Sequence, residues 1–444
     1  MRIQLSDHFT YSRLIRFVFP SIVMMIFTSI YGVVDGLFVS NLIGKTPFAA
    51  INLIWPYLMG LTVVGFMIGS GGTALVSRSL GEGKKERANQ EFSLLVYVTI
   101  AIGLVFTVLG LVTLRPVAIL FGAKGELLDI AVRYGRIVAL ALMPFMLQTT
   151  FQTFFITAEK PKLGLLVTVL AGLTNMVLDA LFIAVFRWGV EGAALATAMS
   201  QVVGGIVPLI YFARPNNSLL RLTKTRWNGR ALWQTCTNGS SELMTNLSMS
   251  IVNALYNLQL LKLAGENGVA AYGVIMYANF IFVAIFVGYA IGSAPVVGYH
   301  FGADNTNELK NLFRKSLVLM GICGVVMLVL GVWLAGPLSR IFVGYDAELL
   351  ALTTRGFRMY SLSFLLMGFN IFGSAFFTAL SNGPVSAAIS FLRTLVFQIA
   401  AIFLLPLILP DADGIWMAVV TAEGLALLVT LFFFAKKKKV YHYI

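Results

Sequence analysis

Long apolar runs, separated by short charged or Gly/Pro-containing breaks, follow one another along the whole chain. An α-helix needs about 20 apolar residues to cross the hydrocarbon core of a bilayer, and most of these runs reach that length. Reading the runs between breaks predicts twelve spans, near 13–40, 48–79, 90–114, 127–158, 162–186, 190–213, 231–263, 269–301, 310–335, 347–380, 384–409 and 413–435. The pattern therefore predicts an all-α polytopic membrane protein with twelve transmembrane helices.

The pattern also repeats once, at a spacing of 221 to 222 residues. Four matches keep this register: 77–95 with 298–317, 119–128 with 341–350, 133–136 with 355–358 and 154–158 with 376–380. We therefore predict two six-helix bundles, 1–213 and 231–444, joined by a polar cytoplasmic linker, 214–230. Six spans per half insert both halves the same way up, so their pseudo-two-fold axis runs along the membrane normal, as in many secondary transporters.

Composition agrees with this reading, because 58% of the 444 residues are hydrophobic and only 11% are charged, against roughly 25% charged in soluble proteins. The net charge of +13 does not point to a nucleic-acid partner. Of the Lys and Arg residues, 21 fall on the side shared with the termini and 10 on the other. By the positive-inside rule, both termini of this multi-pass protein are expected in the cytoplasm, with the bilayer of the cell (inner) membrane around it.

Five ionisable residues lie well inside the predicted spans: Asp35, Asp179, Glu242, Arg393 and Glu423. Such residues usually face the bundle interior or a water-filled cavity, where they mark ion or substrate paths. The alternative for each is a structural polar contact that holds two helices together.

Asp179 has Asn175 one helical turn before it, on the same face of the helix. A carboxylate beside an amide offers oxygens to a small hard cation or a proton. Asp35 lies at a similar predicted depth, toward the outer end of the first span. Two carboxylates close together in a low dielectric cannot both stay ionised without a cation. We therefore predict that Asp35 and Asp179 share a proton or a sodium ion.

The second half does not copy this pair, since Asp35 corresponds to Tyr256 at the repeat spacing. It carries its own set of ionisable residues instead: Glu242, Arg393 and Glu423. This set predicts a polar cluster or a substrate cavity, in which the arginine can pair with either glutamate. Over all five intramembrane residues, four negative charges face one positive charge, which favours a cationic, partly apolar guest.

Several signatures are missing from the sequence. It has no P-loop motif GxxxxGK[ST], so we expect no ATP-driven step. It has no HExxH motif, Cys-rich cluster or Ser/His/Asp constellation, which argues against an enzyme, a cofactor, or a metal other than sodium at the cation site. Pro20, about four turns before Asp35, interrupts the hydrogen bonding of the first span and predicts a gating bend there.

Three segments together resemble the multidrug and toxic compound extrusion (MATE) family, over essentially the whole chain: "VDGLFVSNLIGKTPFAAINL", "GTALVSRSLGEGKKERA" and "VGYHFGADNTNELK". The first looks like the family's first-span signature, and the other two look like its paired endings of spans 2 and 8. The resemblance implies efflux of organic compounds in exchange for a cation.

Within that family, the sequence is more similar to the DinF-like prokaryotic branch, which has a cation site in its N-terminal half. The resemblance carries that site over to Asp35, Asn175, Asp179 and Thr197, with Gln152 where an asparagine is usual; Pro20 matches a proline linked to bending of the first helix. The NorM-like branch has an acidic site in its C-terminal half. Met249 and Asn370 stand at those positions, so we do not expect that site here.

Together, the residues and the resemblance predict a secondary active multidrug efflux antiporter. It would export small organic compounds, cationic and amphipathic, in exchange for H⁺ or Na⁺; the residues suit either ion. One alternative is a lipid-linked oligosaccharide flippase of related architecture, against which the acidic balance argues. Another is a membrane-embedded enzyme or sensor that transports nothing.

Overall fold

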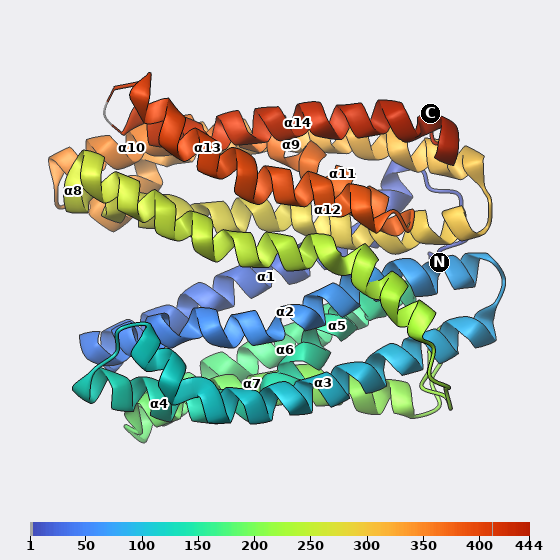
Figure 1. Cartoon of the computed structure of the whole chain (residues 1–444), viewed down its shortest axis with the longest axis horizontal. Helices are drawn as coiled ribbons and strands as arrows, with labels where there is room; N and C mark the ends of the chain where they lie inside the picture. The colour runs from blue at the N-terminus through green and yellow to red at the C-terminus, as the bar shows by residue number, and fades with distance from the viewer. Residues whose placement is uncertain (1–2, 411) are drawn as a thin grey trace.

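Two helical bundles lie side by side in the computed structural model, which describes residues 3–410 and 412–444 (Figure 1). The N-terminal bundle comprises α1 (Tyr11–Leu42), α2 (Lys45–Gly81), α3 (Lys85–Leu120), α4 (Gly125–Ala139), α5 (Leu142–Thr157), α6 (Pro161–Asp179), the π-helical turn η1 (Ala180–Val185) and α7 (Gly189–Ala213). The second bundle begins with α8 after a segment that packs along α3, where the backbone N–H of Arg221 donates to Asn89 Oδ1 at 2.8 Å.

The C-terminal bundle comprises α8 (Gly229–Gly302), α9 (Thr306–Val343), α10 (Ala347–Ser361), α11 (Phe364–Ala379), α12 (Gly383–Phe391), the π-helical turn η2 (Leu392–Val396), α13 (Phe397–Leu404), the short η3 (Leu405–Leu407) and α14 (Asp413–Tyr441). No β-strand occurs in the described ranges.

The number of spans agrees with the predicted fold class. Over the described residues, nine helices are long and apolar enough to cross a membrane, and eleven spans result when each bent pair counts as one. The 74-residue α8 bends back at Gly265, where φ is 62°, and so supplies two spans. This brings the total to twelve and confirms the all-α polytopic architecture. Glycine is needed at the bend because other residues rarely adopt a positive φ.

Two spans are broken in a way that the apolar pattern did not predict. The α4–α5 pair bends by 55° and the α10–α11 pair by 47°. The two breaks fall at corresponding places in the two bundles, so the structure repeats even this local irregularity. A hydropathy pattern reports only that a run is apolar, and it does not report the direction in which the helix continues.

Close glycine contacts join the two bundles at the end of the molecule that holds both termini (Figure 1). A Cβ added at Gly81 of α2 would overlap the carbonyl oxygen of Tyr299, and one at Gly302 of α8 would overlap that of Arg78. Gly288 similarly allows α8 to approach the α1 backbone at Ile22. At the opposite end, Gly32 of α1 has open space around it. Glycines therefore let the backbones of the two bundles approach closely at the end that holds the termini.

The N-terminal segment crosses this closed end and contacts both bundles. The backbone N–H of Leu5 donates to Glu159 Oε1 at 2.8 Å, in the N-terminal bundle. The N–H of Phe9 donates to Glu308 Oε1 at 2.9 Å, in the C-terminal bundle. The side chains of Leu5 and Phe9 are fully buried. The segment therefore ties the two halves together where they already meet.

Candidate functional site

The two aspartates of the N-terminal bundle, Asp35 of α1 and Asp179 of α6, come together in the structure. The carboxyl group of Asp35 adjoins both that of Asp179 and the amide of Asn175. Asp179 is fully buried and Asn175 is 2% exposed. The structure thus brings together three of the five residues predicted for the cation site.

Four acceptor oxygens at this point have no hydrogen-bond donor among the described residues: Asp35 Oδ1, Asn175 Oδ1 and both carboxylate oxygens of Asp179. A buried acceptor without a donor costs about 1–3 kcal/mol, and more when it is charged. Proteins rarely keep several such groups in one place without a functional reason. Convergent oxygens of carboxylates and an amide suit a proton or a small hard cation.

The local backbone explains why the acids meet. Gly172 lies on the same face of α6 as Asn175 and Asp179, and it allows the rings of Phe27 and Tyr31 in α1 to pack directly against α6. The π-helical turn η1 begins immediately after Asp179. Such turns often occur at functional sites, because they re-aim side chains within a helix.

Tyr134 of α4 completes this site, although it is not among the residues predicted from the sequence. It is 2% exposed, its hydroxyl lies beside the Thr197 side chain, and it lies within electrostatic range of Asp35 and Asp179. Thr197 of α7 thereby joins the site through the tyrosine. The repeated RYGR segment, residues 133–136, is the sequence signal that contains Tyr134, but by itself that segment indicates only the duplication.

Gln152 of α5 is placed differently from the other predicted ligands. Its Nε2 donates to Thr168 Oγ1 at 3.4 Å. Thr168 precedes Asn175 by seven residues on α6, which corresponds to about 10 Å along the helix axis. The hydrogen bond therefore holds the Gln152 amide deeper in the bundle than the two acids.

Pro20 lies inside α1, which continues through it as a helix. The neighbouring residues Val18 and Ile22 are those that touch Gly292 and Gly288 of α8. The missing backbone hydrogen bond thus falls at the contact between the two bundles. A change in the curvature of α1 at Pro20 would act directly on that contact.

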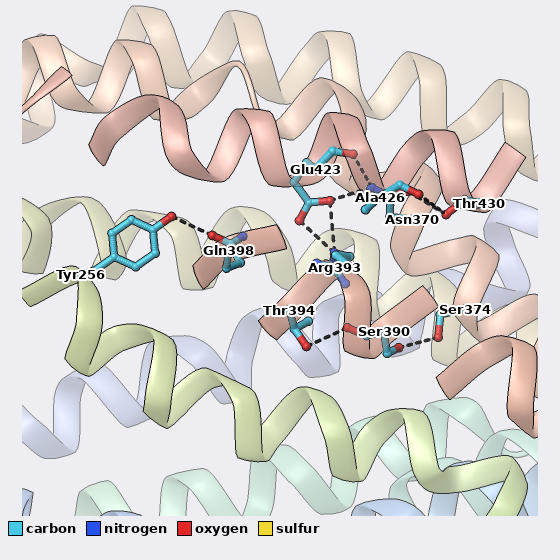
Figure 2. A network of polar contacts seen from close by, with 10 residues as sticks. All are labelled: Tyr256, Asn370, Ser374, Ser390, Arg393, Thr394, Gln398, Glu423, Ala426 and Thr430. Carbon is cyan, nitrogen blue, oxygen red and sulfur yellow. Dashed lines mark hydrogen bonds and ion pairs between the residues drawn. The ribbon is translucent and has the colours of Figure 1, made fainter. Parts of the chain in front are cut away.

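Arg393 and Glu423 of the C-terminal bundle form a different arrangement, shown in Figure 2. Arg393 Nε donates to the two carboxylate oxygens of Glu423 at 2.8 and 3.1 Å. Asn370 Nδ2 donates to Glu423 Oε2 at 2.8 Å, and Thr430 donates to Asn370 Oδ1 at 2.9 Å. Of the two glutamates open to Arg393 in the sequence, the structure therefore selects Glu423. Arg393 lies in the π-helical turn η2, and Asn370 supports the ion pair.

A cavity of about 270 Å³ reaches this cluster. Its wall includes Glu242, Arg393 and Glu423, together with Met249 and Tyr256, while the N-terminal bundle contributes Ser70, Thr73 and Thr153. Small-molecule sites have volumes of roughly 300–1,000 Å³, so this cavity lies near the lower limit.

In the described part of the chain, no three His, Cys, Asp or Glu side chains are grouped so that they could hold a metal ion.

Comparisons with known proteins agree with the overall fold. The family model described as MatE matches residues 20–181 and again residues 243–404, so the same model recognises each half at the same relative position. The multidrug export protein MepA of Staphylococcus saprophyticus is 24% identical over 387 residues, covering 86% of this chain and 84% of that protein. MepA of Staphylococcus aureus strain MRSA252 is 22% identical and covers 95% and 92%. A crystal structure of a MATE protein in complex with MaL6 superimposes with a TM-score of 0.93, at 22% identity and 98% coverage of both chains.

Proposed function

Because the chain belongs to the MatE family of efflux transporters, we propose that it is a secondary active multidrug antiporter. It exports small amphipathic organic cations across the cell membrane in exchange for H⁺ or Na⁺. The relatives named as multidrug export proteins support the class of substrate and the direction of transport. The observation that carries the proposal is the buried Asp35–Asp179 pair with its unpartnered oxygens.

In this mechanism the coupling cation enters from the side opposite the termini and binds between Asp35 and Asp179. Asn175 supplies a further oxygen, and Tyr134 and Thr197 hold the surrounding polar groups in position. Binding of the cation lowers the free energy of one state of the transporter relative to the other. Antiport requires only that the cation and the organic compound prefer different states.

The conformational change is a rocking of the two bundles against each other. The structure is packed at the end that holds the termini, through the glycine contacts of α2 and α8. Opening of this end requires that these contacts separate and that the N-terminal segment release one bundle. The interruption at Pro20 gives α1 a place to bend during this step.

Vesicles test the proposal directly. The chain is placed in inverted membrane vesicles, and uptake of the fluorescent cation ethidium is followed under a proton gradient, a sodium gradient or neither. We expect uptake with one gradient and its collapse when that gradient is dissipated. Asp35→Asn and Asp179→Asn should each abolish gradient-driven uptake.

The matched control is Asp129→Asn, which removes an exposed carboxylate of the same bundle that pairs with Arg115 at 3.8 Å. This variant should transport like the wild type. Full gradient-driven uptake in both site variants would exclude the proposed coupling. Uptake by the wild type that ignores both gradients would exclude antiport altogether.

A further inference from the structure

Two of the three charged groups on the wall of the cavity form an ion pair with each other. Arg393 and Glu423 form a direct ion pair at 2.8 Å, and their side chains are only 13% and 2% exposed. The amide of Asn370 takes up a further bond of the Glu423 carboxylate. The pair is therefore close to neutral as seen from the cavity, and the Glu423 carboxylate is already satisfied.

Glu242 of α8 is in the opposite situation. It lines the cavity, and its carboxylate forms no hydrogen bond or ion pair with any side chain of the described ranges; only its backbone carbonyl accepts a bond, from Asn246. Arg393 acts on it electrostatically but is engaged by Glu423. The cavity thus keeps one uncompensated carboxylate. A low-dielectric pocket with a single net negative charge selects a monovalent cation.

Aromatic rings line the part of the cavity toward the bend of α8. The rings of Tyr256 and Tyr272 stack at 5.1 Å with an interplanar angle of 12°. The Tyr256 hydroxyl donates to Gln398 at 2.7 Å, and the Tyr272 hydroxyl donates to Asn253 at 2.8 Å (Figure 2 shows the first). These bonds fix the orientation of both rings, which can stack on an aromatic or cationic guest.

The carboxylate and the tyrosines lie at different depths. Tyr256 follows Glu242 on the same helix by a separation that corresponds to about 21 Å along the axis. Met249 and Val252 line the cavity between them. An elongated guest can therefore place its charge near Glu242 and extend an apolar body past these two side chains toward the rings.

We propose that Glu242 is the carboxylate that binds the exported compound, in the cavity that the C-terminal bundle lines together with Ser70, Thr73 and Thr153 of the N-terminal bundle, and that this compound is an amphipathic organic monocation. This assignment rests on the efflux function proposed above. The ion and the compound then bind at different sites in the molecule. The N-terminal acids bind the coupling cation, and Glu242 binds the substrate.

The test is equilibrium binding to the purified full-length chain in detergent, with no gradient present. The probes are tetraphenylphosphonium and ethidium, measured by calorimetry and by fluorescence. Glu242→Gln should weaken binding of both by about 30-fold or more, because a desolvated charge partner is lost. Glu242→Asp should fall between Glu242→Gln and the wild type. Glu266→Gln, an exposed carboxylate on the same helix, should bind like the wild type.

A second measurement uses the wild-type chain and does not depend on how the variant folds. A hydrophobic carbodiimide labels carboxyl groups that face an apolar cavity, and peptide mass spectrometry locates the label. Tetraphenylphosphonium should protect Glu242 from labelling. Unchanged labelling of Glu242 at a saturating concentration of the probe would overturn the assignment, as would binding within threefold of the wild type in Glu242→Gln.

The remaining outcomes separate this inference from the function on which it rests. Tetraphenylphosphonium binding that survives Glu242→Gln but is lost in Asp179→Asn would move the substrate to the N-terminal bundle and leave efflux intact. In another outcome, the wild-type chain binds the zwitterion norfloxacin but not tetraphenylphosphonium, and norfloxacin binding is lost in both Glu242→Gln and Arg393→Gln. This outcome would overturn the proposal that the exported compound is a monocation. A wild-type chain that neither binds nor moves any of these compounds would overturn both proposals.

Discussion

The two bundles share one backbone plan but treat their buried acids in opposite ways. In the N-terminal bundle, Oδ1 of Asp35 and both carboxylate oxygens of Asp179 lack a donor among the described residues. In the C-terminal bundle, Glu423 is satisfied by Arg393 and Asn370. A satisfied buried ion pair is a fixed part of the structure, whereas a pair of acids without donors is suited to exchange a cation. Duplication therefore preserved the fold, and the function of each half follows from a few side chains.

The comparison also extends to the helices that carry these residues. Asp179 immediately precedes one π-helical turn, and Arg393 lies within another. Both turns belong to spans that correspond in the two-fold repeat, residues 161–185 and 383–407. Each half therefore has a π-helical turn in this span, but the two turns are not at equivalent positions in the repeat, and they present different groups.

The largest expected effect comes from Asp179→Asn. The variant keeps the shape of the side chain but removes the charge that the coupling cation requires. Gradient-driven export should fall by about 100-fold, the loss expected when a coupling free energy of roughly 3 kcal/mol disappears. Equilibrium binding of tetraphenylphosphonium in detergent should remain within about threefold of the wild type, because neither Asp35 nor Asp179 lines the cavity that holds the proposed substrate site. Transport in vesicles and binding in detergent are measured on the same preparation.

The second prediction concerns stability rather than transport. Arg393→Gln leaves Glu423 charged, buried and without its main partner, which should cost about 3–5 kcal/mol of unfolding free energy. Thermal unfolding in detergent should show a clearly lower midpoint. The double variant Arg393→Met with Glu423→Leu should recover most of the loss, since no unpaired charge remains. A single variant as stable as the wild type would show that the ion pair is not structural.

Much of the architecture could be predicted from the sequence. Run length and break positions were enough for the twelve spans, and the register of the repeat was enough for two bundles, because both depend only on hydropathy. The bends within α4–α5 and α10–α11 could not be predicted in this way. They depend on how each helix packs against its neighbours, and they leave no distinct hydropathy signal.

The parts of the site that could be predicted are those where a single charged residue lies in an apolar run. Asp35 and Asp179 stand out because an acid in an apolar run is costly, and their proximity follows from similar depth. Tyr134 does not stand out, since a tyrosine in a membrane helix is common. Its role depends on the Thr197 hydroxyl and on two carboxylates from other helices. The choice of Glu423 over Glu242 as the partner of Arg393 likewise depends on packing.

The third prediction sharpens the description of the N-terminal site. Tyr134→Phe and Thr197→Val each remove one of two neighbouring hydroxyl groups, whose interaction we expect to be worth about 1 kcal/mol. Each should weaken binding of the coupling cation by about fivefold, as measured by the concentration of ion that gives half-maximal export. The double variant should be little worse than either single variant, because the two groups act as one unit. Fully additive losses would mean that the two side chains contact the cation independently.

The smallest effect is expected for substitution of Gln152. This substitution tests whether Gln152 is a cation ligand, as the family resemblance implies, or lies outside the site, as its position in the structure indicates. The likeness assigns Gln152 a ligand position, whereas its hydrogen bond to Thr168 lies about 10 Å along α6 from Asn175. At that separation, substitutions usually act independently of the site. Gln152→Ala should therefore change the half-maximal ion concentration by less than about twofold, with Thr168→Val as the matched control for the lost hydrogen bond. A tenfold weakening in Gln152→Ala alone would mean that the amide reaches the acids in another state of the cycle. In that case the cation site of the N-terminal bundle includes Gln152 in addition to Asp179 and the four residues that lie around it: Asp35, Asn175, Tyr134 and Thr197.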